Sequence, residues 1–482
     1  MARNDAKRRA PAGDDKTLSE TGARDNFDYL SPLDTRYYGD DRAVYAALHP
    51  YLSEAAVIRY QVKVEQAIVA SLEQAGIAPR GISARLAQAA ARVTPAAVYQ
   101  EERRTHHNIR ALVNCLAAHL PEEERGFVHL FATSADIMDT ARSLALRDFT
   151  REALLPELRE LVRTLVEEAL RYAEVPQIGR THGRFAEPIT VGYWLANFIA
   201  RLTTRAGKIA AAAKDLRGMF SGAVGAHSAL ALAWPEDPAA IEREVLDRLG
   251  LRPGEGSVST QVIQAEYVTD YAHALTSTFG VLANIADDFR HLMRSEIAEA
   301  GEDLDPHQVG SSTMPHKINP KNFENVKSLW KAFMPRIMTV YLDQVSEHQR
   351  DLTNSASMRF FSELAAGTFY AIHRLNGALK RVRISAPAAR RNLEQARELV
   401  LKARESGSDL LSLVEADPEA SRLWARVPEE RKAIIRDPAR YAGDSAARTR
   451  AVCKEARDKL DNPWFLRQLE RPDERKTLLV GS

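Results

Sequence analysis

The sequence contains very little cysteine. Of its 482 residues only Cys115 and Cys453 are cysteines, and neither belongs to a CxxC pair or a Cys/His cluster. This argues against a disulfide framework and against a structural zinc site, and it fits a reducing compartment. We therefore expect a cytoplasmic protein that folds without cross-links, because a chain of this length can bury large apolar cores.

Long apolar runs and an excess of one charge are also missing. No stretch approaches the roughly 18 apolar residues of a membrane span, and the polar start lacks the apolar segment of a signal peptide. We expect residues 1–25 to form a disordered tail. The 66 Lys and Arg residues balance 65 Asp and Glu residues, giving a net charge of +1. No nucleic-acid or membrane partner is expected, and any anion must be recognised locally.

Glycine and proline are sparse over long intervals, which predicts an all-α protein. Apolar residues recur there at three- and four-residue spacing among Ala, Leu, Glu and Arg. The 260–300 run alone would make a helix roughly 60 Å long. Such long helices with wide apolar stripes favour an elongated bundle that also packs against other copies of the chain. Five long runs are expected, at 134–173 with a break near Pro156, 190–219, 260–300, 320–342 with a kink near Pro335, and 355–382.

Proline positions suggest three domains after the tail. Helices should be shorter before about residue 125 and after about residue 386, where prolines recur. We expect an N-terminal helical domain at 26–125, a central long-helix domain at 126–383 and a C-terminal helical domain at 384–482.

The most informative stretch is Gly310-Ser311-Ser312-Thr313-Met314-Pro315-His316-Lys317-Ile318-Asn319-Pro320. Lys317 supplies a point charge and Asn319 a neutral donor, while the glycine and serines let consecutive backbone N–H groups turn toward one anion. A carboxylate is the anion that this stretch is expected to bind. Ser-rich loops of this composition are also common as exposed connections without chemistry, so the interpretation depends on the whole eleven-residue pattern.

This stretch resembles the shared motif of the fumarase/aspartase superfamily, whose members remove a group from a succinyl unit and release fumarate or a relative of it. The resemblance implies a three-domain all-α fold with an oligomeric helical core, a homotetramer, and no metal or organic cofactor. It implies Ser311 as the proton-abstracting base, whose pKa the loop amides and Lys317 would have to lower. It also implies four substrate ligands in the loop, Ser312, Lys317, Ile318 and Asn319.

Arg180-Thr181-His182-Gly183 lies between two helical runs, where an imidazole can donate a proton near neutral pH. A capping or packing histidine is the alternative. The element resembles the superfamily's Arg-Thr-His motif, which implies His182 as general acid. Arg184 and Phe185 replace the Gln and Pro often found there, and this departure would alter the substrate's surroundings.

Thr105-His106-His107-Asn108 begins a helix on which adjacent imidazoles cannot share a face. It resembles the superfamily's His-Asp element, which implies His107 at the substrate with a supporting role in proton handling, and His106 and Asn108 as substrate ligands. Asn108 replaces the usual Asp, so the group recognised there would differ. An ordinary polar first turn of a helix is the alternative interpretation.

Thr133-Ser134-Ala135-Asp136 opens the first long run, where hydroxyls and free N–H groups make an anion-ready helix end. A simple N-cap would look the same. The element resembles the superfamily's Thr-Ser-x-Asp, which implies Thr133 and Ser134 as substrate ligands.

Three more elements resemble the adenylosuccinate lyase branch of the superfamily. Ser31-Pro32-Leu33-Asp34-Thr35-Arg36-Tyr37 matches an element whose Arg and Tyr contact the nucleotide, and Gln261 matches a substrate-binding Gln. Arg350-Asp351-Leu352-Thr353-Asn354-Ser355 matches an Arg-Asp-x-x-Asn-Ser element, with Arg359 one helical turn further on.

A phosphomonoester needs several cationic and hydroxyl donors on one dianion, and these elements contain them. Ser355 and Arg359, at positions i and i+4, are predicted to share one helix face. A solvated surface charge is the alternative for any single arginine. The proposed phosphate ligands are Arg36, Arg350, Ser355 and Arg359.

The resemblance therefore implies a lyase that eliminates fumarate from a succinylated nitrogen, with adenylosuccinate as the expected substrate and purine nucleotide biosynthesis as the pathway. Whether it also performs the related aminoimidazole carboxamide step stays open. The alternatives are a related lyase with a different N-succinyl substrate, and a helical scaffold without activity. Met314 to Lys317 argue against argininosuccinate lyase, fumarase and aspartase, and carboxymuconate cycloisomerases would lack the phosphate set. In the tetramer that the family forms, Ser311, His182 and His107 would lie far apart within one chain.

Overall fold

The computed structural model describes residues 31–39, 41–303, 314, 317–402, 410–437 and 439–462. The chain divides into two compact units, Met1–Ala47 and Leu48–Ser482. Among its described residues, the first contains the π-helical turn η2 (Leu33–Tyr37), in which Arg36 is exposed, and the start of α1 (Arg42–Leu52). The second contains the helical framework described below. The three-domain boundaries expected from the sequence stay a prediction.

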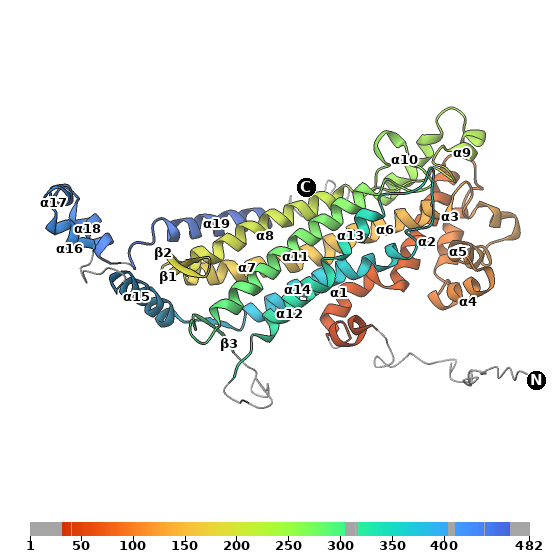
Figure 1. Ribbon diagram of the computed structural model, residues 1–482. Coiled ribbons are helices and arrows are strands. Elements are labelled where there is room, and N and C mark those ends of the chain that lie inside the picture. Colours follow the sequence, from red (N-terminus) through yellow and green to blue (C-terminus); the bar gives the residue numbers. More distant parts are fainter. Residues whose placement is uncertain are drawn as a thin grey trace, which may run out of the picture. The chain divides into compact units, whose positions relative to one another are not determined.

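Long helices lie side by side through the second unit (Figure 1). Its interior is aromatic and apolar, with the Phe289 and Phe323 rings stacked at a centroid distance of 4.9 Å and Tyr271 and Phe279 completely buried. The all-α prediction is confirmed. The bundle consists of α7 (Leu155–Arg171), α8 (Val191–Lys214), α11 (Glu266–Leu292), α12 (Lys321–Phe333) and α14 (Phe361–Leu379), with α19 (Ser445–Leu460) packed on α7 and α8.

Both proline-induced breaks occur where the sequence predicts them. The 134–173 run divides into α6 (Ser134–Phe149), the π-helical segment η4 (Thr150–Leu154) and α7, with Pro156 in the first turn of α7. The 320–342 run divides into α12 and α13 (Arg336–Leu342), with Pro335 immediately before α13. Proline lacks the N–H that a continuing helix needs, so each helix restarts beside it.

Two predicted helices begin later than expected. The helix in the 260–300 run starts at Glu266, so α11 has 27 residues and a length of about 40 Å. The last run is helical only from Ser357, as the 3₁₀ turn η6 (Ser357–Phe360) followed by α14. In both places Ser and Thr side chains bind nearby backbone groups, as Thr260 does with Val262, and this competes with helix formation.

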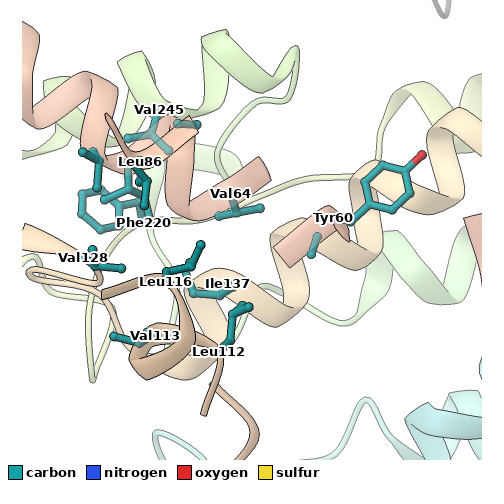
Figure 2. Close-up of a cluster of buried hydrophobic side chains, with 14 of the residues drawn as sticks. Tyr60, Val64, Leu86, Leu112, Val113, Leu116, Val128, Ile137, Phe220 and Val245 are labelled. Carbon is teal, nitrogen blue, oxygen red and sulfur yellow. The ribbon is translucent and has the colours of Figure 1, made fainter. Parts of the chain in front are cut away.

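A second apolar core lies beside the bundle (Figure 2). It joins α2 (Glu54–Gln74), α3 (Ile82–Ala90), α5 (Asn108–Ala117), α6 and α10 (Pro238–Leu249), and α2 is longer than the short helices expected before residue 125. Ile109 and Leu112 on α5 and Ile137 on α6 are almost completely buried in it. Because apolar residues in the first turns of α5 and α6 enter one core, their N-terminal ends are held in a fixed relation.

Strands are short and form two antiparallel pairs within the described residues. β1 (Pro176–Thr181) pairs with β2 (Arg184–Thr190), and β3 (Ala300–Glu302) pairs with β4 (Val382–Ile384). No helix among the described residues is long and apolar enough to cross a membrane. The remaining elements are α1 (Arg42–Leu52), α4 (Pro95–Thr105), η3 (Glu122–Phe127), α9 (Ser228–Ala233), η5 (Glu255–Ser257), α15 (Ala386–Lys402), α16 (Leu410–Ala416), α17 (Pro418–Ala425) and α18 (Glu429–Arg436).

Candidate active site

His107 and Ser134 meet where α5 and α6 begin. His107 is the N-cap of α5, and Ser134 is the first residue of α6. The imidazole Nε2 of His107 lies 3.5 Å from the hydroxyl Oγ of Ser134. Free backbone N–H groups at the start of a helix attract anions. The structure thus brings two sequence-predicted residues together beside such a helix end.

The second ring nitrogen of His107 fixes the tautomer. Its Nδ1 accepts a hydrogen bond from the backbone N–H of Arg110 at 3.2 Å. A nitrogen that accepts a hydrogen bond carries no proton in the neutral ring, so the proton resides on Nε2, the atom facing Ser134. His107 is exposed to solvent, so Nε2 can also reach a bound molecule.

The segment from Thr105 to Asn108 begins a helix, as the sequence predicted, and it also joins the end of α4 to the start of α5. His106 ends α4 with a positive φ of 50°, so the two imidazoles leave the backbone at the junction of two helices. The Asn108 amide nitrogen lies 3.4 Å from the Met138 sulfur on α6, and its carbonyl oxygen accepts the N–H of Ile109. Asn108 therefore connects α5 to α6 in this structure.

Asp136 organises the start of α6. Its carboxylate accepts backbone N–H groups from Thr133 at 2.8 Å, Ser221 at 3.0 Å and Gly222 at 3.2 Å. Burial raises the pKa of Asp136 to about 6, and the three N–H donors partly oppose that rise. Through Asp136, the predicted ligands Thr133 and Ser134 share one anchor with the loop that begins at Ser221.

Two further loops converge on this end of α6. Ser259 Oγ lies 2.8 Å from Ser221 Oγ, and a Cβ on Gly225 would lie 2.3 Å from the Ser259 carbonyl oxygen. The Ile263 N–H donates to Asp139 on α6 at 3.3 Å. Gln261, between these contacts, donates its backbone N–H to the Gln349 carbonyl at 3.2 Å and so lies beside Arg350. Gln261 precedes α11 and does not belong to it.

Ser355 and Arg359 do not share the predicted α-helical face. Ser355 lies in a turn, and Arg359 in η6, where three residues complete one turn. Both side chains are exposed and Arg350 is half-buried. All three remain within the segment that the sequence predicts for phosphate binding.

His182 occupies the tip of the hairpin formed by β1 and β2, where the sequence predicts only a loop. Thr181 pairs with Arg184, and the two residues between them have φ values of 56° and 73°. Two positive φ values are typical of a type I′ turn, for which Gly183 is well suited. His182 is exposed at this tip. The hairpin is held by Arg180, whose guanidinium lies 2.7 Å from Glu299 and 5.5 Å from the Phe185 ring.

Lys317, Ile318 and Asn319 precede α12 and have no regular secondary structure. Lys317 and Ile318 are exposed, and the Lys317 N–H donates to the Met314 carbonyl at 2.9 Å. Ser311 and Ser312 lie outside the described residues. Arg36 and Tyr37 lie in the first unit, so their relation to the other residues is not described.

The β1–β2 hairpin, with His182 at its tip, and α5, which His107 caps, lie toward opposite ends of the second unit (Figure 1). The hairpin leads directly into α8, whose 24 residues extend about 36 Å. Beyond its far end, Met219 exchanges hydrogen bonds with Thr140, which lies only two turns from Ser134 on α6. One chain therefore cannot place both imidazoles on one small molecule.

Several residues that shape the site were not predicted from the sequence. Asp139 is one of them, and its signal in the sequence is the spacing of Asp136 and Asp139 at i and i+3 on a largely apolar helix. Glu65, completely buried, lies 2.7 Å from the ring of His129 just before Thr133. These two residues are 64 positions apart, so no local pattern could reveal their contact.

The chain is similar to known lyases. A family model described as lyase matches residues 36–332. An adenylosuccinate lyase of Archaeoglobus fulgidus is 35% identical over 379 residues, covering 77% of this chain and 81% of the relative. An N-acetyl-S-(2-succino)cysteine lyase of Enterococcus italicus is 30% identical over 310 residues, covering 64% of this chain and 66% of the relative.

A solved structure shows the same fold. The 3-carboxy-cis,cis-muconate lactonizing enzyme of Pseudomonas putida matches with a TM-score of 0.73 and 23% identity, over 89% of this chain and 100% of that chain. The chain therefore belongs to the lyase family matched by residues 36–332, the fumarase/aspartase superfamily that includes the adenylosuccinate lyases.

Proposed function

We propose that this chain is a C–N lyase that converts adenylosuccinate to AMP and fumarate in purine nucleotide biosynthesis in the cytoplasm. The observation that carries the proposal is the His107–Ser134 pair at the joined ends of α5 and α6, next to the loops of Gln261 and Arg350. The pair supplies an imidazole, a hydroxyl and helix-end N–H groups for a succinyl carboxylate. The neighbouring loops supply an arginine for a phosphate.

The chemistry is a β-elimination. Ser311 removes a proton from the succinyl carbon next to a carboxylate, and the electron pair moves onto that carboxylate. When it returns, the C–N bond breaks, fumarate forms, and His182 donates a proton to the departing nitrogen. Donors near the carboxylate, among them Lys317 and Asn319, stabilise the doubly charged intermediate more than the substrate.

We propose a homotetramer whose active sites combine residues of different chains. The separation of His182 from His107 by the length of α8 supports this, because both have roles at one substrate. Mixing His107→Asn and His182→Asn, each inactive alone, should restore part of the activity, since a mixed oligomer contains some sites with both imidazoles. No recovery after subunits have exchanged would contradict shared sites.

The decisive experiment is the ultraviolet assay of adenylosuccinate cleavage, with fumarate measured independently. Ser311→Ala should bind substrate but lose most turnover. Wild-type turnover by this variant would overturn the serine base, and no fumarate from the wild type would overturn the substrate. The succinylated aminoimidazole carboxamide ribotide should be assayed in parallel, since both substrates carry a succinyl group on nitrogen beside a phosphorylated ribose.

A second candidate is a lyase for a different succinylated compound. Arg184 and Phe185 favour it, because the exposed Phe185 ring stacks on Arg180 beside His182, the proposed acid. The relationship to a succinocysteine lyase shows that leaving groups vary among relatives. Fumarate release from N-succinyl amino acids without a phosphate, but not from adenylosuccinate, would establish this alternative.

A further inference from the structure

The segment between α13 and η6 is a loop whose two ends, at Asp343 and Ser357, are joined by a hydrogen bond. We call these joined ends the neck of the loop. Asp343 follows α13, and Ser357 begins η6. The Ser357 hydroxyl oxygen lies 2.8 and 2.7 Å from the two carboxylate oxygens of Asp343 and 3.0 Å from the Asn354 carbonyl oxygen. The single hydroxyl proton of Ser357 therefore has three possible acceptor oxygens. Its hydrogen bond to the charged Asp343 carboxylate is the strongest of these.

Packing on one side of the neck is incomplete. A pocket of about 120 Å³ lies there, with Asp343, Ser357 and Met358 in its wall. An apolar wall that is not filled contributes little to holding two segments together. The hydrogen bond between Asp343 and Ser357 closes the loop at this point, beside contacts of Arg336 on α13 with Glu363 on α14 and with the Phe360 ring.

The rest of the loop is connected by internal hydrogen bonds. The Asp351 carboxylate accepts the Glu347 N–H at 2.9 Å, the Thr353 N–H at 2.8 Å and the Thr353 hydroxyl at 2.6 Å. The Gln349 carbonyl accepts the Gln261 N–H at 3.2 Å, which joins the loop to the segment before α11. These hydrogen bonds connect Arg350 to both ends of the loop, so a change in position at Ser357 alters the position of Arg350.

The neck also faces α6. Arg142 forms an ion pair with Asp139, whose carboxylate accepts the Ile263 N–H. The positive charge of Arg142 acts on Asp343, where it opposes the effect of burial, which raises the pKa of that carboxyl. The helix that presents Ser134 thus influences the neck of the loop that presents Arg350.

We propose that Asp343 and Ser357 are positioning residues for recognition of the substrate's phosphate, because their hydrogen bond closes the neck of the loop that holds Arg350 and Ser355. The proposal rests on the proposed function. Neither side chain touches substrate. Opening the neck displaces the phosphate donors as a group, while His107 and Ser134, held by a separate core, stay in place.

The test compares Ser357→Ala with Ser357→Thr, which restores the hydroxyl, and with Ser362→Ala, the same substitution one turn further along. The value of kcat/KM is measured for adenylosuccinate and for its dephosphorylated nucleoside. Loss of one hydrogen bond to a charged group predicts a fall of about tenfold for the nucleotide, mainly through KM, and little change for the nucleoside. Ser357→Thr should recover most of this loss, and Ser362→Ala should resemble the wild type.

Three outcomes would overturn the proposal. Equal losses for both substrates would indicate a general structural role, an unchanged nucleotide value would remove any role, and a wild type that does not distinguish the substrates would show that the loop binds no phosphate. If the wild type releases no fumarate at all, the proposed function fails. The neck is then tested by equilibrium binding of AMP and adenosine, where Ser357→Ala should weaken only AMP.

Discussion

His107 and Ser134 are 27 residues apart in the chain, yet the imidazole Nε2 lies 3.5 Å from the hydroxyl Oγ. His107 both caps α5 through Nδ1 and directs Nε2 toward the start of α6. The helix-capping role of His107 and its proposed role at the substrate can therefore be separated by substitution.

Replacing His107 by Asn should retain the helix cap and remove the imidazole. Asn is a preferred N-cap, whereas His107→Ala should also lose about 1 kcal/mol of unfolding free energy. Both variants should lose most fumarate release, but only His107→Ala should be less stable in urea unfolding. Equal stabilities of the two variants would show that the cap contributes nothing.

Asp136 should give the wild type a pH-dependent stability. Its pKa of about 6 in the folded protein exceeds the ordinary value of 3.8, so the folded state binds this proton more tightly than the unfolded state does. The contribution of Asp136 to the free energy of unfolding should therefore fall by up to about 3 kcal/mol as the pH rises from about 4 to 7.

Denaturant unfolding of the wild type and Asp136→Asn across this range checks the prediction. The difference between them should change in favour of the variant as the pH rises. Asp351→Asn is the control, because hydrogen bonds from Thr353 and Glu347 lower the pKa of Asp351 to about 2, below the range. Parallel curves for the wild type and Asp136→Asn would contradict the assignment.

Gly225→Ala should damage the site more than its positive φ alone explains. The new Cβ would lie 2.3 Å from the Ser259 carbonyl oxygen and 2.5 Å from that of Thr260. Gly76→Ala is the matched control, since Gly76 also has a positive φ but no atom within 4 Å of an added Cβ. The control should cost about 1 kcal/mol, as a residue forced into the left-handed region does.

Gly225→Ala should cost more, and its KM should rise because the segment with Gln261 moves. Unfolding and kinetics of the two variants measure both effects. Equal losses of stability would mean that the loop at Gly225 adapts without cost.

His182→Asn should fold normally and lose turnover. The residue is exposed, and Asn tolerates the left-handed backbone that the hairpin tip requires. Loss of a general acid typically lowers kcat by about 10² to 10⁴. Thermal unfolding and the pH profile of kcat check this, and an unchanged kcat would assign the proton to another group.

Several features of the fold follow directly from local sequence. The apolar spacing predicts the bundle helices, and Pro156 and Pro335 predict the breaks, because a missing N–H acts on the helix in which it occurs. The start of α11 was predicted wrongly at residue 260. Thr260 satisfies its polar groups with Val262, and Ile263 with Asp139, so helix is not the most stable local state.

The sequence by itself determined which residue types are present for the chemistry and which family the chain resembles, since motifs such as Thr-Ser-x-Asp are short and read in order. Only the tertiary structure decided that His107 faces Ser134 and that the buried Asp136 joins two loops. It also decided that His182 lies at a hairpin tip, separated from His107 by the length of α8. These relations depend on packing between segments many residues apart. The burial of Asp136 and the distance between His107 and Ser134 are set by the joint packing of α2, α5, α6 and α10. No single segment encodes this packing.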